Sequence, residues 1–375
     1  MAKLIEITGK ALAGEWGMDD ETGEGIPVLR TTNFTNEGVV DYSDVVTRTI
    51  TKKNIDEKFL RDGDIIIEKS GGSDKYPVGR VIYFDGPSNT YLFNNFTGLL
   101  RVQDQEKWFP KYVFYSLYGN YRRGGTRPFE NKTTGLHNLK TDDYVSRYEV
   151  TEADYSKQKE ICNYLDKLYS IIKMREDELA KLDELIKARF VELFGDPDLN
   201  HMGWKESLLS EKLDVLGGYA FKSDEFDEES GIPVLRIGNI NAGYFRPVNM
   251  VYWHEDESLE RYAMYPGDLV MSLTGTVGKD DYGNVCILGN DYDKYYLNQR
   301  NAKLEIKEGL DKLYLSEILK FDKIKKRLTG ISRGVRQANI ANRDILNLCI
   351  PVPPMAIQEQ FSHFVKQVDK SKVVA

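Results

Sequence analysis

Basic side chains cluster in two stretches of the chain, residues 120–140 and residues 320–343. The second stretch carries eight basic residues against one acidic residue, Asp322, and the first carries five against Glu130. Lys and Arg neutralise DNA phosphates, and Arg, Lys, Asn and Gln also contact the edges of bases. Both stretches therefore indicate a DNA-facing surface, although a solvated charged loop is the alternative for each of them.

Single residues in these stretches and in two repeated motifs are the candidates for DNA contact. The candidates in the basic stretches are Arg122, Arg123, Arg127, Asn131, Lys132, Lys325, Lys326, Arg327, Arg333, Arg336 and Gln337. Arg30 with Asn33, and Arg236 with Asn239, follow matching strands, where they either reach a base or hold a turn. Glycine-containing loops add Lys69, Ser70, Thr274 and Lys279, with a plain hairpin turn as the alternative.

The residues do not assemble into a recognisable catalytic or metal-binding motif. The GTVGK run at 275–279 lacks the first glycine of a phosphate loop, and Asp follows its lysine where Ser or Thr should bind magnesium. A methyltransferase motif and a glycine-rich cofactor loop are also absent. Three widely spaced cysteines and four histidines argue against zinc. We therefore expect no catalytic residue and no metal, and an enzyme is the weaker alternative.

The chain contains one internal duplication that must position these residues. GIPVLRTTNF at 25–34 and GIPVLRIGNI at 231–240 share seven of ten residues. RDGDIII at 61–67 likewise matches YPGDLVM at 265–271, and Gln158 matches Gln358. The matches keep their order along the chain, which chance would not preserve. A repeat of this length predicts two homologous domains rather than a solenoid.

Each domain copy is followed by a segment with helical periodicity. Between residues 155 and 193, apolar residues alternate at spacings of four and three, without Gly or Pro. This pattern predicts one long helix that pairs with another helix; an amphipathic helix packed on a domain is the alternative. The pattern restarts after Pro351–Pro354 and ends at Ala375. The domain copies alternate short Val- and Ile-rich runs with turn residues, which predicts an α+β fold with mostly β cores.

The sequence at 334–360, GVRQANIANRDILNLCIPVPPMAIQEQ, resembles the hallmark of DNA specificity subunits of type I restriction–modification systems. That hallmark is a Gly-x-x-Gln-x-x-Ile segment, a strand ending in Ile-Pro-x-Pro-Pro, and a Gln-rich helix start. The matching residues are Gly334, Gln337, Ile340, Ile350, Pro351, Pro353, Pro354 and Gln358. The resemblance covers essentially the whole chain, in the order domain, helix, domain, helix. The first copy departs from it, because residues 144–158 lack the Ile-Pro-x-Pro-Pro signature.

The resemblance implies an architecture and a set of partners. Residues 1–150 and 195–350 would be two target-recognition domains, each reading half of a split site in double-stranded DNA. Residues 151–194 and 351–375 would form an antiparallel coiled coil that separates the half-sites. Two methyltransferase subunits would dock, and motor–nuclease subunits would join in some complexes. S-adenosylmethionine would bind the methyltransferase partner, so we expect no cofactor in this chain.

The second helix is shorter than the first, which leaves part of the predicted helix pair open. In an antiparallel pair, the apolar residues left without a partner would be Ile161, Leu165, Leu168 and Ile172. Exposed apolar stripes usually mark an interface. The occupant would be a methyltransferase subunit, a second copy of this chain, or a separately encoded helix. A family scaffold that no longer reads DNA is a further alternative.

Composition limits where the protein acts. The formal net charge of −8 argues against DNA binding only weakly, because the basic residues are clustered. The chain has no run of about 18 apolar residues and its first residues have no secretory pattern. We expect a prokaryotic cytoplasmic protein that does not span a membrane.

Overall fold

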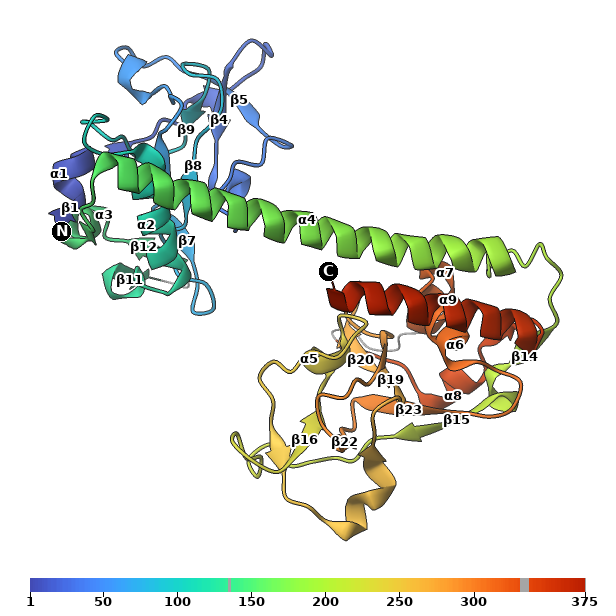
Figure 1. Cartoon of the computed structure of the whole chain (residues 1–375). Helices are drawn as coiled ribbons and strands as arrows, with labels where there is room; N and C mark the ends of the chain where they lie inside the picture. Colours follow the sequence, from blue (N-terminus) through green and yellow to red (C-terminus); the bar gives the residue numbers. More distant parts are fainter. Residues whose placement is uncertain (134–135, 331–336, 375) are drawn as a thin grey trace. The chain divides into compact units, whose positions relative to one another are not determined.

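The computed structural model describes residues 1–133, 136–330 and 337–374 of the chain (Figure 1). Contacts between residues divide the chain into two compact units, residues 1–173 and residues 174–375. Both units mix helices with several small sheets, as the Val- and Ile-rich runs predict. In the described part, no helix is long and apolar enough to cross a membrane.

Unit 1 is built on two four-stranded sheets. The first has the order β2-β10-β6-β8, with strands Leu12–Ala13, Thr97–Leu100, Ile65–Glu68 and Val81–Tyr83. The second has the order β3-β5-β4-β9, with strands Met18–Asp19, Val46–Thr49, Ile26–Leu29 and Leu92–Phe93. Two smaller sheets are β11-β12-β7 (Glu130–Thr133, Leu136–Leu139, Ser70–Gly72) and β1-β13 (Ala2–Lys3, Glu149–Val150). The helices are α1 (Leu4–Thr8), α2 (Pro110–Arg122) and α3 (Thr141–Arg147).

Unit 2 repeats this arrangement. Its two four-stranded sheets are β15-β23-β19-β21 (Leu213–Gly217, Asn301–Ile306, Leu269–Ser272, Val285–Ile287) and β17-β16-β22-β18 (Tyr252–Trp253, Ile232–Leu235, Tyr295–Leu297, Ala263–Met264). Smaller sheets are β20-β24 (Thr274–Thr276, Gln337–Asn339) and β14-β25 (Glu206–Leu208, Cys349–Pro351). Short helices are α5 (Ile237–Ile240), α6 (Lys312–Ile318), α7 (Asp322–Thr329) and α8 (Asn342–Leu346).

The two units share the same strand register. In unit 1 Leu99 pairs with Ile66, and in unit 2 Lys303 pairs with Val270, so both partners shift by the same number of residues. Each GIPVLR motif forms a strand, β4 or β16, that pairs in parallel with β9 or β22. All other strand pairings in the four-stranded sheets of both units are antiparallel. Parallel pairing needs a long crossover, and the strands between the motif and its partner supply it.

Helix α4 (Tyr155–Phe194) is a single helix of 40 residues. It contains neither Gly nor Pro, and Gly195 ends it with a φ of 80°, where a residue with a Cβ would be strained. Helix α9 (Met355–Val374) packs beside the C-terminal part of α4 (Figure 1). Phe361 contacts the rings of Phe190 and Phe194, whereas Lys372 pairs with Asp183. Residue numbers rise along one helix as they fall along the other, so the pair is antiparallel.

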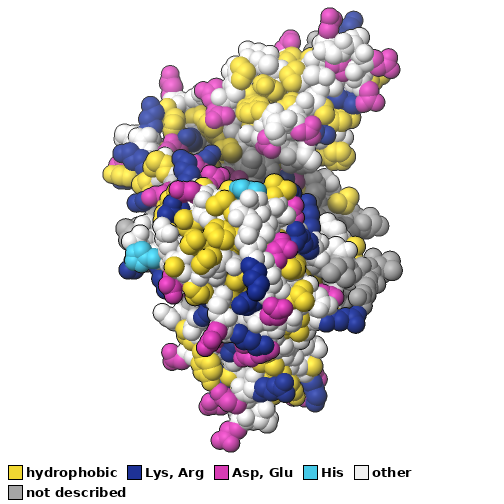
Figure 2. Space-filling view, turned by 90° about the vertical axis from the view of Figure 1, so that its right-hand side faces the viewer, with side chains coloured by type: hydrophobic (Ala, Val, Ile, Leu, Met, Phe, Trp, Pro, Cys, Tyr) yellow, Lys and Arg dark blue, Asp and Glu magenta, His cyan; other side chains and the backbone are white. Residues whose placement is uncertain are grey.

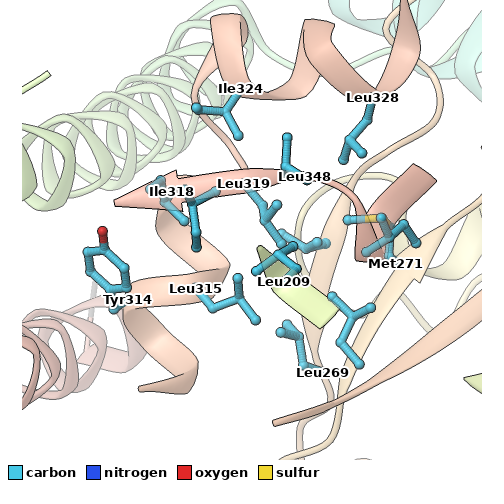
Figure 3. Close-up of a cluster of buried hydrophobic side chains, with 14 of the residues drawn as sticks. Leu209, Leu269, Met271, Tyr314, Leu315, Ile318, Leu319, Ile324, Leu328 and Leu348 are labelled. Carbon is cyan, nitrogen blue, oxygen red and sulfur yellow. The ribbon is translucent and has the colours of Figure 1, made fainter. Parts of the chain in front are cut away.

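The core of unit 2 joins its helices to its sheets. Figure 3 shows side chains of α6 and α7 converging on strand residues of β19 and on Leu209 and Leu348. The labelled residues from the helices are Tyr314, Leu315, Ile318, Ile324 and Leu328, and Leu319 directly follows α6. Burying one Leu or Ile side chain contributes roughly 1.5–3 kcal/mol, so this cluster fixes α7 and the strands that flank the candidate site.

Candidate nucleic-acid interface

Strands β7 and β12 form the framework of the candidate site in unit 1. Ser70 on β7 lies opposite Asn138 on β12, and β12 also pairs with β11. Lys69 precedes β7; its N–H bonds the carbonyl of Phe96 at 2.8 Å, and its carbonyl accepts from the N–H of Leu139 at 2.9 Å. Partial burial lowers the pKa of Lys69 from 10.5. The strand edges therefore hold the two candidates in place.

Strands β20 and β24 form the matching framework in unit 2. Thr274 pairs with Asn339 and Thr276 pairs with Gln337. Thr274 is buried, whereas Lys279 is exposed in the turn that follows and bonds the carbonyl of Thr276 through its N–H. Only the strand position of Gln337 is described. Arg333 and Arg336, predicted to contact DNA, lie outside the described residues.

The basic residues of the first stretch lie at the end of α2 and in the turn after it. Arg122 and Arg123 are exposed; Arg122 reaches the carbonyl of Asn36 at 3.5 Å. The guanidinium of Arg127 donates to the carbonyls of Asp74 and Lys75 at 3.3 and 3.4 Å. Asn131 is exposed on β11, and of Lys132 only its position on that strand is described. Arg122, Arg123 and Asn131 are thus accessible, while Arg127 also braces the loop beside β7.

A buried histidine that the sequence reasoning did not select holds this hairpin to its neighbour loop. His137 Nδ1 lies 2.9 Å from Glu130 Oε2, and its Nε2 lies 3.5 Å from Asp74. Glu130 Oε1 accepts from the N–H of Val78 at 3.0 Å. In the sequence, Glu130 is the one acidic residue of a basic stretch, and no local pattern signals this contact. The cluster connects β11, β12 and the loop before Val78.

In the second stretch, two of the three described candidates already have partners. Lys325 donates to Asn284 Oδ1 at 2.8 Å and to the carbonyl of Asp280 at 3.2 Å. Arg327 pairs with Asp198 at 2.7 Å, and this contact, with one from Lys323, lowers the pKa of Asp198. Lys326 is exposed. It is therefore the candidate on α7 that is most accessible to phosphate.

The two Arg–Asn pairs form the same buried turn in both units. The Asn33 side chain is 2% exposed; it accepts from the N–H of Arg30 at 2.8 Å and donates to the carbonyls of Asp41 and Asp44. Asn239 accepts from the N–H of Arg236 at 3.0 Å and donates to two carbonyls in the same way. All hydrogen-bonding groups of both amides are occupied. This geometry favours the turn-holding alternative for the two asparagines.

The matched glutamines lock each long helix to its own domain. Gln158 is 1% exposed; its amide accepts from the N–H of Phe109 at 2.9 Å and donates to the carbonyls of Lys107 and Ala153. Gln358 accepts from the N–H of Asp311 at 2.8 Å and donates to the carbonyl of Pro353. Each glutamine joins the first turn of a long helix to the segment before α2 or α6. Sequence matching identified the pair, but not its role.

The predicted apolar stripe of α4 is accessible. Leu168 and Ile172 are 56% and 57% exposed, Leu165 is 36% exposed, and Ile161 is partly buried. On the same face of the helix farther along, Ile186 and Phe190 are buried and belong to the core that includes α9. The opposite face holds Asp166, which bonds Lys111 at 2.8 Å. The stripe therefore continues a helix-pairing face onto a segment that unit 1 leaves open.

Charge on the surface is mixed. Figure 2 shows Lys and Arg side chains interspersed with Asp and Glu on the face in view, with hydrophobic groups between them. A net charge of −8 is thus compatible with local basic positions. Within the described ranges, no group of three His, Cys, Asp or Glu side chains could hold a metal ion.

Comparison with known proteins identifies the family. Residues 202–373, most of unit 2, match the type I restriction modification DNA specificity domain. The chain belongs to the family of type I restriction–modification DNA specificity subunits. The specificity subunit of the type I restriction enzyme MjaVIII, from Methanocaldococcus jannaschii, is 25% identical over 313 residues, which are 77% of this chain and 72% of that protein.

Two further relatives agree with this family. The EcoBI specificity subunit of Escherichia coli is 27% identical over 178 residues, covering 46% of this chain and 34% of that protein. The crystal structure of a type I restriction–modification S subunit from M. genitalium has a TM-score of 0.52 at 16% identity and covers 99% of this chain and 89% of that one. This last likeness shows a shared fold. Type I specificity subunits are a non-catalytic family.

Proposed function

We propose that this specificity subunit reads a split site in double-stranded DNA through its two repeated domains, residues 1–150 and 195–350. The observation that carries the proposal is the repeated strand framework, β7 with β12 and β20 with β24, which holds polar and basic candidates at equivalent places. The helical segments 151–194 and 351–375 act as an antiparallel coiled-coil spacer between the two half-sites. The subunit works in the prokaryotic cytoplasm, where its DNA lies.

In this proposal, different residues contact the phosphates and the bases of the DNA. Exposed cations bind phosphates and fix the register of the protein on the duplex; they are Arg122, Arg123, Lys279 and Lys326. Residues on the strand edges, such as Ser70 and Asn131, approach the bases. Arg333 and Arg336 join this group as proposed contacts from their sequence alone.

Half-site binding tests this division of labour. In a complex reconstituted with methyltransferase subunits, the double variant Arg122→Ala/Arg123→Ala should weaken protection of one half-site, and Lys279→Ala/Lys326→Ala should weaken the other. Each pair should also reduce the slope of binding against salt concentration by about two, because each lost phosphate contact removes roughly one released counterion. Equal loss at both half-sites in each variant would contradict the two-reader proposal.

Methylation mapping tests the function as a whole. Genome-wide detection of methylated bases, with and without the gene, should reveal a split motif that disappears with the gene. Methylation by this chain without a partner would instead support an enzyme. A reconstituted complex that assembles but binds no DNA would support the alternative of a scaffold that no longer reads DNA.

The open stripe of α4 is the proposed docking surface for a methyltransferase subunit. Two such subunits bind, S-adenosylmethionine is held by them, and motor–nuclease subunits join where a restriction enzyme is present. The support is the exposed apolar surface of Leu165, Leu168 and Ile172, which continues a face that elsewhere pairs with a helix. A second copy of this chain or a separate helix are the other occupants that the surface would fit.

A charged substitution on the apolar stripe of α4 distinguishes between these possible occupants. Leu168→Glu should abolish co-purification with the methyltransferase subunit, whereas Ser170→Glu, which is exposed on another face of the same helix, should leave it intact. Size analysis of the isolated chain serves as the second measurement. A wild-type dimer that Leu168→Glu converts to monomer would assign the surface to self-association, and an unaffected monomer that still binds its partner would contradict docking here.

A further inference from the structure

One loop in each unit has the same position and was not among the candidates. We call them the tip loops; they are residues 94–96 after β9 and residues 298–300 after β22. The carbonyl of Phe96 accepts from the N–H of Lys69 at 2.8 Å, and the carbonyl of Arg300 accepts from the N–H of Leu273 at 2.8 Å. In both units the tip loop is therefore hydrogen-bonded to the residue that opens the proposed reading strand.

That connection extends to the second reading strand. The carbonyl of Lys69 accepts from Leu139 at 2.9 Å, and the carbonyl of Leu273 accepts from Ile340 at 2.8 Å. Each unit thus presents three segments in the same order: the tip loop, the strand β7 or β20, and the strand β12 or β24. A ligand that contacts the two strands would therefore also contact the tip loop beside them.

A glycine holds the frame of each tip loop. A Cβ on Gly14 would lie 2.0 Å from the carbonyl oxygen of Asn94, and one on Gly218 would lie 2.2 Å from that of Asn298. Any other residue would collide with the loop backbone, so both positions require glycine. The N–H of Thr97 or Asn301 closes each loop onto the same Asn carbonyl at 3.1 and 2.9 Å. The loop backbone is therefore preorganised and the same in both copies.

The side chains at the tips differ between the copies. Phe96 is 53% exposed, and Arg300, at the equivalent position, is also exposed. Within the described ranges, the guanidinium of Arg300 has no hydrogen bond or ion pair. Arg300 lines a groove of about 500 Å³ that also includes Arg236 and Asn249. A loop backbone shared by both units, with different accessible side chains at the tips, is the arrangement expected where two copies of one domain distinguish different ligands.

We propose that the tip loops are a third base-reading element, and that Phe96 and Arg300 are specificity-determining residues for the two half-sites. This inference rests on the proposed function. Arg300 donates two hydrogen bonds to the N7 and O6 acceptors of a guanine in the major groove, which is the commonest specific protein–DNA contact. Phe96 makes an apolar contact with the C5-methyl group of a thymine. Single exposed apolar residues are common on protein surfaces, but this one occupies the position of the repeated loop.

Base analogues test each contact atom by atom in the reconstituted complex on its mapped site. Replacing the relevant guanine by 7-deazaguanine removes the N7 acceptor, and should weaken wild-type binding by roughly 5- to 150-fold, the range for a bidentate Arg–guanine contact. Arg300→Ala, which removes the donors, should already bind more weakly and should not respond to the analogue. Replacing thymine by deoxyuridine in the other half-site should weaken wild-type binding a few-fold and leave Phe96→Ala unaffected.

Matched variants control for charge and for folding. Arg261→Ala removes another exposed cation of unit 2, and Met18→Ala removes another exposed apolar group of unit 1; both should respond to the analogues as the wild type does. Retained responses in Arg300→Ala and Phe96→Ala would overturn the inference while leaving the proposed function intact. Equal weakening of Arg300→Ala on all DNA sequences would also overturn it, because it would assign the arginine to phosphate. A wild-type complex that ignores the split site would instead overturn the proposed function.

Discussion

Replacing Gln158 by Ala should detach the first turn of α4 from the segment before α2. The amide of Gln158 is 1% exposed and makes three hydrogen bonds of 2.8–2.9 Å, all to backbone groups of unit 1. An alanine side chain can replace none of them. The variant leaves the N–H of Phe109 and the carbonyls of Lys107 and Ala153 without their partner.

The loss in the free energy of unfolding depends on how deeply these three backbone groups are buried. A buried backbone group that loses its partner costs about 1–3 kcal/mol. Phe109 and Ala153 are only partly buried, so water can reach some of the vacated space, and we take the lower end of the range for each group. The expected loss in the free energy of unfolding of unit 1 is therefore about 3 kcal/mol. Unit 2 should be unaffected, because Gln158 contacts only unit 1.

Hydrogen exchange on the full chain measures this effect locally, which matters because two units need not unfold together. Peptides that cover residues 105–115 and 153–162 should exchange roughly 100-fold faster in Gln158→Ala, the factor that corresponds to about 3 kcal/mol. Gln105→Ala is the matched control, since Gln105 is exposed and should change stability by less than about 0.5 kcal/mol. Gln358→Ala should shift the effect to unit 2, where the same lock occurs. Equal exchange in Gln158→Ala and Gln105→Ala would refute the reasoning.

Three other substitutions have expected outcomes. Phe361→Ala, a fully buried ring between phenylalanines of α4, should destabilise unit 2 by about 3–5 kcal/mol in urea, more than Phe364→Ala at a half-buried position. Asn239→Ala should lower stability by about 2 kcal/mol or more together with any loss of DNA binding, whereas a base reader would lose binding alone. Burial raises the pKa of Glu68 above 4.5 despite Arg80, so folding takes up a proton there. The stability that this proton uptake contributes is fully present below pH 4.5 and is lost as pH rises through the raised pKa of Glu68. The free energy of unfolding of Glu68→Gln should therefore increase relative to that of the wild type over this rise in pH. A difference in the free energy of unfolding in urea that does not change with pH would contradict this.

Patterns that are local or repeated were readable in the sequence. The spacing of apolar residues from 155 to 193 predicted α4 closely, because helix formation over forty residues without Gly or Pro depends on neighbours three and four positions apart. The antiparallel course of α9 agrees with the expected pairing. The duplicated motifs indicate two similar domains, and matching residues of the two units have the same strand register. Family membership followed from motifs in a fixed order.

Contacts between distant residues were not readable in this way. The sequence suits Asn33 and Asn239 equally to a base or to a turn, and only burial and three backbone partners for each side chain favour the turn. In the sequence, Lys325 does not differ from the other lysines of the basic stretch, and only the fold places it beside Asn284. Asn284 lies 41 residues from Lys325 in the sequence, whereas the partners of the two asparagines lie 3 to 11 residues away. In both cases residue type and spacing do not show which groups the side chain meets after folding.

The sequence by itself determined the duplication, the long helix with its apolar face, and the family, because each is written in residue order and periodicity. Tertiary structure decided which polar residues are already occupied, what the matched glutamines bond, and that Phe96 and Arg300 stand at equivalent tips. The physical reason is that a side chain's role depends on the groups it meets after burial, and those groups come from segments that only folding brings together.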